Sequence, residues 1–426
     1  MDPRFLAHNS HLEGIESFKD RDPQLRRLKT QKYVHTPGLL AQLPTEEPGI
    51  YTLGGGRQIG KTTLLKQWML RLLKQGIAPE SIAFLSGELI DDQHSLLRLL
   101  EPLQNTRFLI IDEVTYIKDW DRGIKYLADA GLLENTILML TGSDLVMIQE
   151  ARMRFPGRRG HADICDFHLY PLSFREVFLL KNPGFLEPES CLLFEEFENY
   201  IQHGGFLTAI NDIASKQSIQ RSTYNTYSDW IRGDMLKRGK KEHFLIEILG
   251  AIAKRYGSQI SWNALTQDLS IDHPKTVSEY IAALEMMDVV FVQHALIEDK
   301  LVAAPKKPKK IYFSDPFIYH ALRNWLDWPM PSDKSHLVEA CVASHYRRFF
   351  PTYYIKAEGE VDVVYISQKK FWPVEIKWTE RARPKDLKQI LKYPNGLILT
   401  KNSKPGNLEG CPMLPLPQHL FHLTGS

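Results

Sequence analysis

Residues 55–62 read Gly55-Gly56-Arg57-Gln58-Ile59-Gly60-Lys61-Thr62, which matches the pattern G-x-x-x-x-G-K-[ST]. An apolar run at 50–53 precedes this stretch, and a helical pattern begins at Thr62 and continues through Thr63. Glycines here let backbone N–H groups turn inward around phosphates, and the helix N-terminus adds its positive dipole end. Lys61 would reach the β- and γ-phosphates, and the Thr62 hydroxyl would ligate Mg²⁺. The stretch predicts an ATP site, with a structural glycine-rich turn as the alternative.

A second apolar run, residues 108–111, ends in two acidic residues, Asp112 and Glu113. Asp112 would hold Mg²⁺ through water, and Glu113 would polarise the water that attacks the γ-phosphate. A second acid directly after the first favours hydrolysis over binding alone. The structural alternative is a buried strand with an acidic tip.

Small hydroxyl residues end a third apolar run, where residues 138–143 read Leu-Met-Leu-Thr-Gly-Ser. In P-loop ATPases with a strand between those of the two nucleotide motifs, the next strand along the chain carries a polar sensor of the γ-phosphate, so Ser143 or Thr141 at the end of this run is the candidate. An arginine after this strand would stabilise transition-state charge in a neighbouring subunit, unless the loop is merely solvated and basic. The candidates are Arg152, Arg154, Arg158 and Arg159.

Apolar runs alternate with helical patterns from residue 50 to about residue 170, after a charged, helical lead-in at 1–45. Strands alternating with helices predict a parallel sheet covered on both faces, so the expected fold class is α/β. The expected strands are 50–53, 82–85, 108–111, 137–140 and 164–169, with helices at 62–74 and 121–130.

A helix–turn–helix–strand unit is predicted after a mostly helical segment at 171–256, which contains the breaker Gly204-Gly205. The unit has helices at 262–269 and 274–287 and a strand at 289–294. Its second helix would face a DNA groove or would dock a protein. The side chains that would make these contacts are His273, Lys275, Thr276, Ser278 and Tyr280.

Lysine and proline dominate residues 300–310, which read as a hinge or wing loop too polar for a core. The segment after it mixes helices and strands. The expected helices are 337–349 and 384–392, and the expected strands are 353–356, 361–366, 371–376 and 396–399.

Acidic residues on two of these strands form a further constellation. Asp362 lies on one strand, and Glu375 and Lys377 lie on the next, spaced so that both point to the same face. Two carboxylates across a hairpin would hold a divalent metal, and the lysine would orient or deprotonate water for attack on a phosphodiester. Glu339 on the preceding helix would complete the set, and Gln389 and Tyr393 fit a downstream Q-x-x-x-Y pattern. Alternating charges on an exposed strand give the same spacing.

Composition and charge narrow the function classes. The 426 residues include 43% hydrophobic and 24% charged residues, as in ordinary folded protein, so disorder and coiled coil are excluded. The four cysteines lie far apart without zinc spacing, and no signal peptide or long apolar stretch is visible, so we expect a cytoplasmic protein that does not enter a membrane. Residues 301–426 carry 19 Lys and Arg against 11 Asp and Glu, a basic balance suited to a polyanion.

Taken together, these motifs resemble a family of prokaryotic AAA-type ATPases, in which a winged helix and a C-terminal domain of PD-(D/E)xK nuclease-like fold follow the P-loop core. The resemblance covers about residues 51–401. It rests on the stretches 56–63, 112–113, 141–143, 157–158, 170–176, 204–206, 360–362 and 374–377.

This resemblance implies an ATPase core with its lead-in at 1–170, a helical lid at 171–240, a winged helix at 241–310 and a nuclease-like domain at 311–426. It implies Mg²⁺-dependent ATP hydrolysis, work on DNA, and a homo-oligomer that shares Arg158, the arginine of Gly157-Arg158, although Arg159 beside it leaves two candidates. The rival interpretations are a nucleotide-switched signalling or defence protein with a C-terminal effector, and a scaffold that binds ATP without useful turnover.

Overall fold

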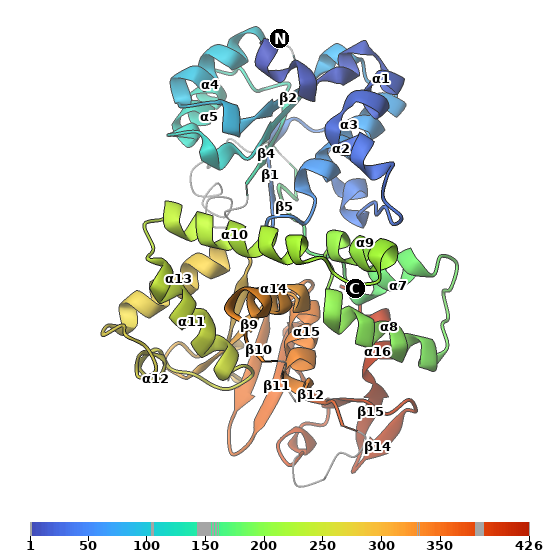
Figure 1. Ribbon diagram of the computed structural model, residues 1–426, viewed down its shortest axis with the longest axis vertical. Helices are drawn as coiled ribbons and strands as arrows, with labels where there is room; N and C mark the ends of the chain where they lie inside the picture. Colours follow the sequence, from blue (N-terminus) through green and yellow to red (C-terminus); the bar gives the residue numbers. More distant parts are fainter. Residues whose placement is uncertain are drawn as a thin grey trace. The chain divides into compact units, whose positions relative to one another are not determined.

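The computed structural model describes residues 2–103, 106–142, 155, 157, 160, 162–329, 331, 333–379 and 387–425. The chain forms two compact units, Met1–Tyr170 and Pro171–Ser426. Each unit has its own sheet or sheets, and each is described by itself (Figure 1).

Five parallel strands form the sheet of the first unit, in the order β2-β3-β4-β1-β5. Strand β4 therefore lies between β1, which precedes the glycine-rich loop, and β3, which ends in Asp112. The predicted parallel sheet is confirmed. The strands are β1 (Gly49–Gly54), β2 (Ile82–Ser86), β3 (Phe108–Asp112), β4 (Ile137–Thr141) and β5 (Asp166–His168).

Helices cover both faces of this sheet, α3 on one and α4 with α5 on the other (Figure 1). Alternate residues of one strand enter opposite cores: Tyr51 of β1 packs with Trp68 of α3, while Ile50 packs in the core that contains Leu96 of α4. This two-sided burial explains why the strands read as continuous apolar runs. The helices are α3 (Lys61–Lys74), α4 (Gln93–Leu100) and α5 (Trp120–Asp129), with short 3₁₀ turns at Pro79–Ser81, Gly87–Leu89, Glu101–Leu103 and Val114–Tyr116.

The lead-in is tied to this core by polar side chains. Asn9 accepts a hydrogen bond from Phe84 N at 2.8 Å and donates one to Phe84 O at 2.7 Å, so its amide pairs with the free side of edge strand β2. The buried Lys66 of α3 donates to His8 O at 2.6 Å and lies 3.2 Å from Asp22. The elements here are η1 (Pro3–His8), η2 (Ser10–Glu13), α1 (Ile15–Arg21), α2 (Pro23–Leu28) and η3 (Gly38–Gln42).

The second unit opens with four helices, as the helical pattern predicts. Ser173 forms a capping box with Glu176 at the start of the first, and the third begins after the predicted breaker, Gly204-Gly205. The helices are α7 (Phe174–Lys181), α8 (Ser190–His203), α9 (Leu207–Lys216) and α10 (Arg221–Lys237).

The predicted helix–turn–helix–strand unit is present. Ser261 caps the first of its two helices by accepting from Ala264 N at 3.1 Å, and the strand β6 pairs antiparallel with β9. Residues 300–310 were expected to form a loop too polar to enter a core. This prediction is wrong for Lys310, the last residue of the stretch, which lies in β9 and is 1% exposed. The elements are α11 (Glu242–Lys254), α12 (Trp262–Thr266), α13 (Pro274–Met286), β6 (Val290–His294), β7 (Leu296–Ile297), β8 (Val302–Ala303), β9 (Lys309–Phe313) and α14 (Pro316–Leu326).

A mixed six-stranded sheet, in the order β10-β11-β12-β13-β15-β14, ends the chain, with α15 packed against β11. The four strands predicted here are confirmed. The helix predicted at 384–392 is wrong where the structure describes it, because residues 387–389 form a turn and only a 3₁₀ turn, η9 (Ile390–Lys392), follows. The elements are α15 (Ser335–Arg347), β10 (Thr352–Lys356), β11 (Glu360–Ser367), β12 (Lys370–Lys377), β13 (Leu397–Thr400), β14 (Gly406–Leu408), β15 (Cys411–Pro415) and α16 (Leu416–His422). Within the described ranges, no helix has the length and apolar character needed to cross a bilayer.

Candidate functional site

The glycine-rich loop joins β1 to α3 and places Lys61 at the start of the helix. Gly55 has φ +141°, and a Cβ atom there would lie 2.4 Å from Leu169 O, so this position requires glycine. Lys61 is 5% exposed, and its Nζ donates to Gly55 O and Gly56 O at 2.9 Å each. The loop therefore holds a fixed positive charge beside a helix N-terminus, an arrangement suited to phosphate.

The remaining predicted loop residues stabilise the turn. Gln58 has φ +62°, Ile59 packs against the core of the α3 face, and Thr63 follows Thr62 in the first turn of α3. Arg57 hydrogen-bonds the Tyr116 hydroxyl and lies 5.6 Å from the centre of that ring.

Asp112 lies at the end of β3, between two hydroxyl groups. Thr62 Oγ1 donates to Asp112 Oδ2 at 2.6 Å, and Thr141 Oγ1 donates to Asp112 Oδ1 at 2.5 Å. Burial raises the pKa of Asp112, while these two hydrogen bonds oppose the rise. Thr62 and Asp112 together offer hard oxygen ligands, so this donor set fits Mg²⁺.

Glu113 follows in a left-handed conformation, with φ +53°. Its backbone N–H donates to Thr141 Oγ1 at 2.9 Å, and its Oε1 lies 3.7 Å from Lys61 Nζ. Gly87 supports this turn from the end of β2, because a Cβ atom at Gly87 would lie 2.4 Å from Glu113 O. Sequence reasoning missed Gly87, since nothing local marks a glycine that is needed by a neighbouring strand.

The structure brings the two nucleotide motifs and Thr141 together, because Thr141 ends β4 and its hydroxyl donates to Asp112. The other sensor candidate, Ser143, lies outside the described residues. The four predicted arginines, Arg152, Arg154, Arg158 and Arg159, also lie outside them.

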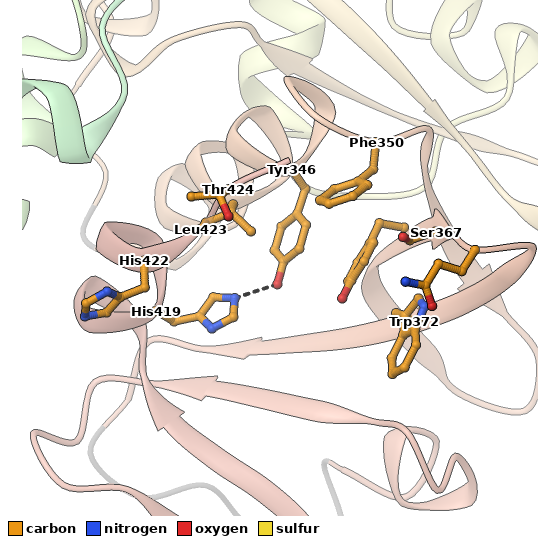
Figure 2. Close-up of a pocket in the computed structure, with 10 residues that line it drawn as sticks. Tyr346, Phe350, Ser367, Trp372, His419, His422, Leu423 and Thr424 are labelled. Atoms are coloured by element: carbon orange, nitrogen blue, oxygen red, sulfur yellow. Dashed lines mark hydrogen bonds between the residues drawn. The ribbon is translucent and has the colours of Figure 1, made fainter. Parts of the chain in front are cut away.

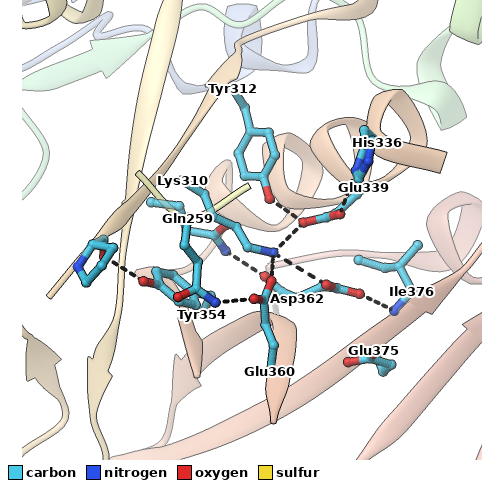
Figure 3. A network of polar contacts seen from close by, with 12 residues as sticks. Gln259, Lys310, Tyr312, His336, Glu339, Tyr354, Glu360, Asp362, Glu375 and Ile376 are labelled. Carbon is cyan, nitrogen blue, oxygen red and sulfur yellow. Dashed lines mark hydrogen bonds and ion pairs between the residues drawn. The ribbon is translucent and has the colours of Figure 1, made fainter. Parts of the chain in front are cut away.

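The C-terminal constellation forms a second polar centre (Figure 3). Carboxylate oxygens of Glu339 on α15 and of Glu360 and Asp362 on β11 all lie within 4.8 Å of one another. The ammonium of Lys310 lies among them, 2.6 Å from Glu339 Oε1, 3.4 Å from Asp362 Oδ1 and in direct contact with Glu360. Glu360 and Lys310 were not predicted for this site, although Glu360 shares a strand face with Asp362.

Burial and neighbouring charges shift the pKa values of Glu339 and Asp362 in opposite directions. Burial would raise the pKa of Glu339, but Lys310 holds it at about 2, and the Tyr312 hydroxyl also donates to this carboxylate. Burial and Glu339 raise the pKa of Asp362 to about 6. Asp362 also accepts a hydrogen bond from Ile376 N at 3.0 Å.

Glu375 and Lys377 form a pair beside this centre rather than within it. Lys377 Nζ lies 2.7 Å from Glu375 Oε1, while Glu375 Oε2 is buried and has no hydrogen-bond partner among the residues that the structure describes. Burial and the Asp362 carboxylate raise the pKa of Glu375 to about 8. Gln389 donates to the Tyr393 hydroxyl at 3.0 Å, but the two residues flank a 3₁₀ turn instead of lying on the predicted helix.

The residues predicted to face a DNA groove from the helix–turn–helix unit differ in their exposure to solvent. His273 and Lys275 are exposed, and Thr276 and Ser278 are half-buried. The prediction for Tyr280 is wrong: it is 3% exposed and its hydroxyl accepts from Lys241 N at 2.7 Å, so it belongs to the core.

A separate cavity of about 400 Å³ lies in the last part of the chain (Figure 2). Aromatic side chains form much of its lining, and Tyr346 OH lies 2.7 Å from His419 Nε2 across it. None of the predicted site residues lines this cavity.

Three family matches cover separate stretches of the chain. Residues 47–178 match the family described as AAA domain. Residues 194–328 and 334–418 match two domains of unknown function, DUF8612 and DUF4143. Together with the parallel sheet and the two nucleotide motifs, the first match supports an AAA-like P-loop core in this part of the chain.

Similar proteins are distant. An uncharacterized protein of Haemophilus influenzae is 27% identical over 254 residues, which are 55% of this chain and 60% of the relative. An uncharacterized protein of Methanocaldococcus jannaschii is 26% identical over 213 residues, 48% of this chain and 44% of the relative. The chain thus spans less than two thirds of either relative.

The similar solved structures have low sequence identity and low TM-scores. The Walker-type ATPase of Pyrococcus abyssi has a TM-score of 0.44 at 15% identity, covering 72% of this chain and 97% of that one. The ORC1 protein of Aeropyrum pernix, solved in complex with DNA, has a TM-score of 0.32 at 15% identity, with coverage of 74% and 96%.

Proposed function

We propose that this protein is a Mg²⁺-dependent ATPase of AAA type that acts on or with DNA. The ATPase activity in this proposal is supported by the position of the Asp112 carboxylate, directly beside the loop that contains Lys61. This carboxylate accepts hydrogen bonds from Thr62 Oγ1 at 2.6 Å and from Thr141 Oγ1 at 2.5 Å. Thr62 and Asp112 would hold Mg²⁺, which when bound neutralises charge on the β- and γ-phosphates.

Each residue of the loop and the two strand ends has a distinct role in this proposal. Lys61 and the backbone N–H groups of residues 55–60 bind the phosphates. Glu113 orients the attacking water and accepts its proton, and Thr141 holds the turn that presents Glu113.

The proposal includes a homo-oligomer in which Arg158 or Arg159 completes the site of a neighbour. An arginine acting in trans contributes to turnover and little to ATP affinity. Arg158→Ala protein mixed with Lys61→Ala protein should therefore regain activity at shared interfaces. Absence of rescue, with subunit exchange demonstrated, would exclude the shared site.

The DNA part rests on the basic balance of residues 301–426 and on the helix–turn–helix–strand unit, where His273 and Lys275 are exposed at the start of α13. Neutralised phosphates release counterions, so binding should weaken steeply with salt. The test is ATP turnover with and without single-stranded, duplex and branched DNA. Turnover that none of these changes, together with salt-insensitive DNA binding, would contradict the proposal.

We propose the same four parts for the chain: a core at 1–170, a lid at 171–240, a winged helix at 241–310 and a nuclease-like domain at 311–426. The acidic centre of the last part, with Asp362 and Glu375 and with Glu339 and Lys377 beside them, offers oxygen ligands suited to a second divalent cation. The donor chemistry supports part of this set, since the carboxylates of Glu339, Glu360 and Asp362 converge within 4.8 Å, while Glu375 lies beside them and pairs with Lys377.

A second candidate function is a nucleotide-switched signalling or defence protein with a C-terminal effector or vestigial nuclease domain. The observation that favours it is Lys310, whose ammonium fills the acidic centre and pairs with its carboxylates. ATP-dependent assembly without any effect of DNA on turnover would support this candidate over the first.

A further inference from the structure

Lys310 is a buried lysine in an unusual position. Its side chain leaves β9 and is 1% exposed, and its Nζ contacts Glu339, Glu360 and Asp362 (Figure 3). Three carboxylates surround this one nitrogen, so the ammonium acts as the cation of this centre.

The surrounding groups carry more negative charge than one lysine neutralises. Three carboxylates lie with oxygens within 4.8 Å of one another, the spacing at which hard divalent cations are bound. Beside them, Glu375 Oε2 is a buried oxygen without a hydrogen-bond partner among the described residues. These carboxylates are the kind of ligands that bind a divalent metal ion, and the Lys310 ammonium lies where that ion would lie.

The two cations exclude each other. A divalent ion needs roughly 2.0–2.6 Å to its carboxylate oxygens, and Lys310 Nζ already lies 2.6 Å from Glu339 Oε1 and 3.4 Å from Asp362 Oδ1. Both positions fall in the same small volume, and two positive charges there would repel. A metal can enter only when the lysine leaves.

We propose that Lys310 is a built-in competitor of divalent metal, which closes the C-terminal acidic centre to Mg²⁺ or Mn²⁺ as long as β9 keeps its place. The inference deepens the proposed second metal site and rests on it. Strand β9 pairs with β6, where Gln293 donates to Tyr353 O at 2.7 Å and to Asp362 O at 3.2 Å. Displacement of this strand pair from β10 and β11 is the movement that would open the site.

Mn²⁺ binding to the nucleotide-free full chain, followed by electron paramagnetic resonance, tests the proposal. Lys310→Met should gain an ion that Asp362→Asn removes again, whereas Asp362→Asn alone should not change Mn²⁺ binding by the wild type. Lys306→Met, which removes an exposed lysine of the same stretch, is the matched control and should gain nothing. ATP turnover, measured separately, should be the same in Lys310→Met as in the wild type.

Removing Lys310 leaves buried carboxylates uncompensated, which destabilises proteins, so a second variant is needed. Lys310→Gln/Glu360→Gln removes one charge of each sign and retains Glu339, Asp362 and Glu375. It should bind Mn²⁺, and Mn²⁺ should raise its unfolding midpoint.

The outcomes separate the two proposals. An Asp362-dependent ion in the wild type, bound as tightly as in the Lys310 variants, overturns the competitor role but keeps the metal site. Folded variants that gain no ion overturn both.

Discussion

Thr141 and Asp112 end neighbouring strands of the parallel sheet, and the Thr141 hydroxyl donates to Asp112 Oδ1 at 2.5 Å. The same Thr141 oxygen accepts from the backbone N–H of Glu113 at 2.9 Å. One hydroxyl thus fixes both consecutive acids, and it does so from the strand that lies between the two nucleotide motifs.

Thr141→Val should lower ATP turnover roughly tenfold while changing ATP affinity little, because the isosteric side chain keeps the packing and loses both hydrogen bonds. Steady-state hydrolysis and nucleotide titration measure the two quantities. Thr136→Val is the matched control, since Thr136 is also buried and its hydroxyl donates to the backbone Thr106 O rather than to an acidic residue. Equal turnover in both variants would contradict a role for Thr141.

Lys61→Ala and Glu113→Gln should fail in different ways. Lys61→Ala removes the buried charge of the phosphate loop and should abolish tight ATP binding. Glu113→Gln should keep binding and stop hydrolysis, because only the carboxylate accepts the proton of the attacking water. Single-turnover assays with filter binding separate the steps, and wild-type turnover in Glu113→Gln would exclude the assignment of Glu113.

Gly87→Ala should reduce turnover strongly, although Gly87 lies outside the two nucleotide motifs. The added methyl group would lie 2.4 Å from Glu113 O, so the turn that presents Glu113 must shift. Gly38→Ala is the control, since a Cβ atom there has open space. Hydrolysis rates and thermal unfolding of both variants test this; a Gly87→Ala protein with full activity would show that the turn tolerates displacement.

Acid should destabilise the second unit through His345. Its Nε2 accepts from Phe174 N at 2.9 Å and its Nδ1 contacts Cys341 O at 2.7 Å, which fixes a neutral ring. Burial lowers the pKa of His345 from 6.5 to about 3. Because the unfolded chain binds the proton first, the free energy of unfolding should fall by about 1.4 kcal/mol per pH unit as pH drops from 6.5 towards 3.

Denaturation of the wild type and of His345→Gln between pH 7 and pH 4 measures this contribution, which the variant should lack. The exposed His243→Gln is the control and should retain the wild-type profile. Identical slopes in all three proteins would assign the acid sensitivity to other groups.

The strands of the first unit and the start of α3 could be predicted because they are marked locally. Apolar runs bounded by glycine or acid mark β1, β3 and β4, and Gly60-Lys61-Thr62 marks the start of α3. The close approach of Asp112 to Thr62 follows, since carboxyl ends of parallel strands share one edge of a sheet.

The acidic centre could be predicted only in part. Asp362 and Glu339 meet as expected, but the third carboxylate is Glu360, and Glu375 turns to Lys377. The lysine- and proline-rich composition of residues 300–310 predicts a polar loop for Lys310, whereas its hydrogen-bond partners Glu339 and Asp362 lie 29 and 52 residues away in the sequence. Such long-range compensation of charge leaves no local pattern.

The Asn9 amide at Phe84 has a consequence for solubility. Strand β2 is the border of the parallel sheet, and an uncovered border is a template on which a second chain can add a strand and start an aggregate. Asn9 occupies both hydrogen-bonding groups of Phe84, and His11 Nε2 lies 3.0 Å from Ile82 O two residues earlier on the same side. The lead-in thereby protects the ATPase core from edge-to-edge association, and a fragment that begins at β1 would expose that template.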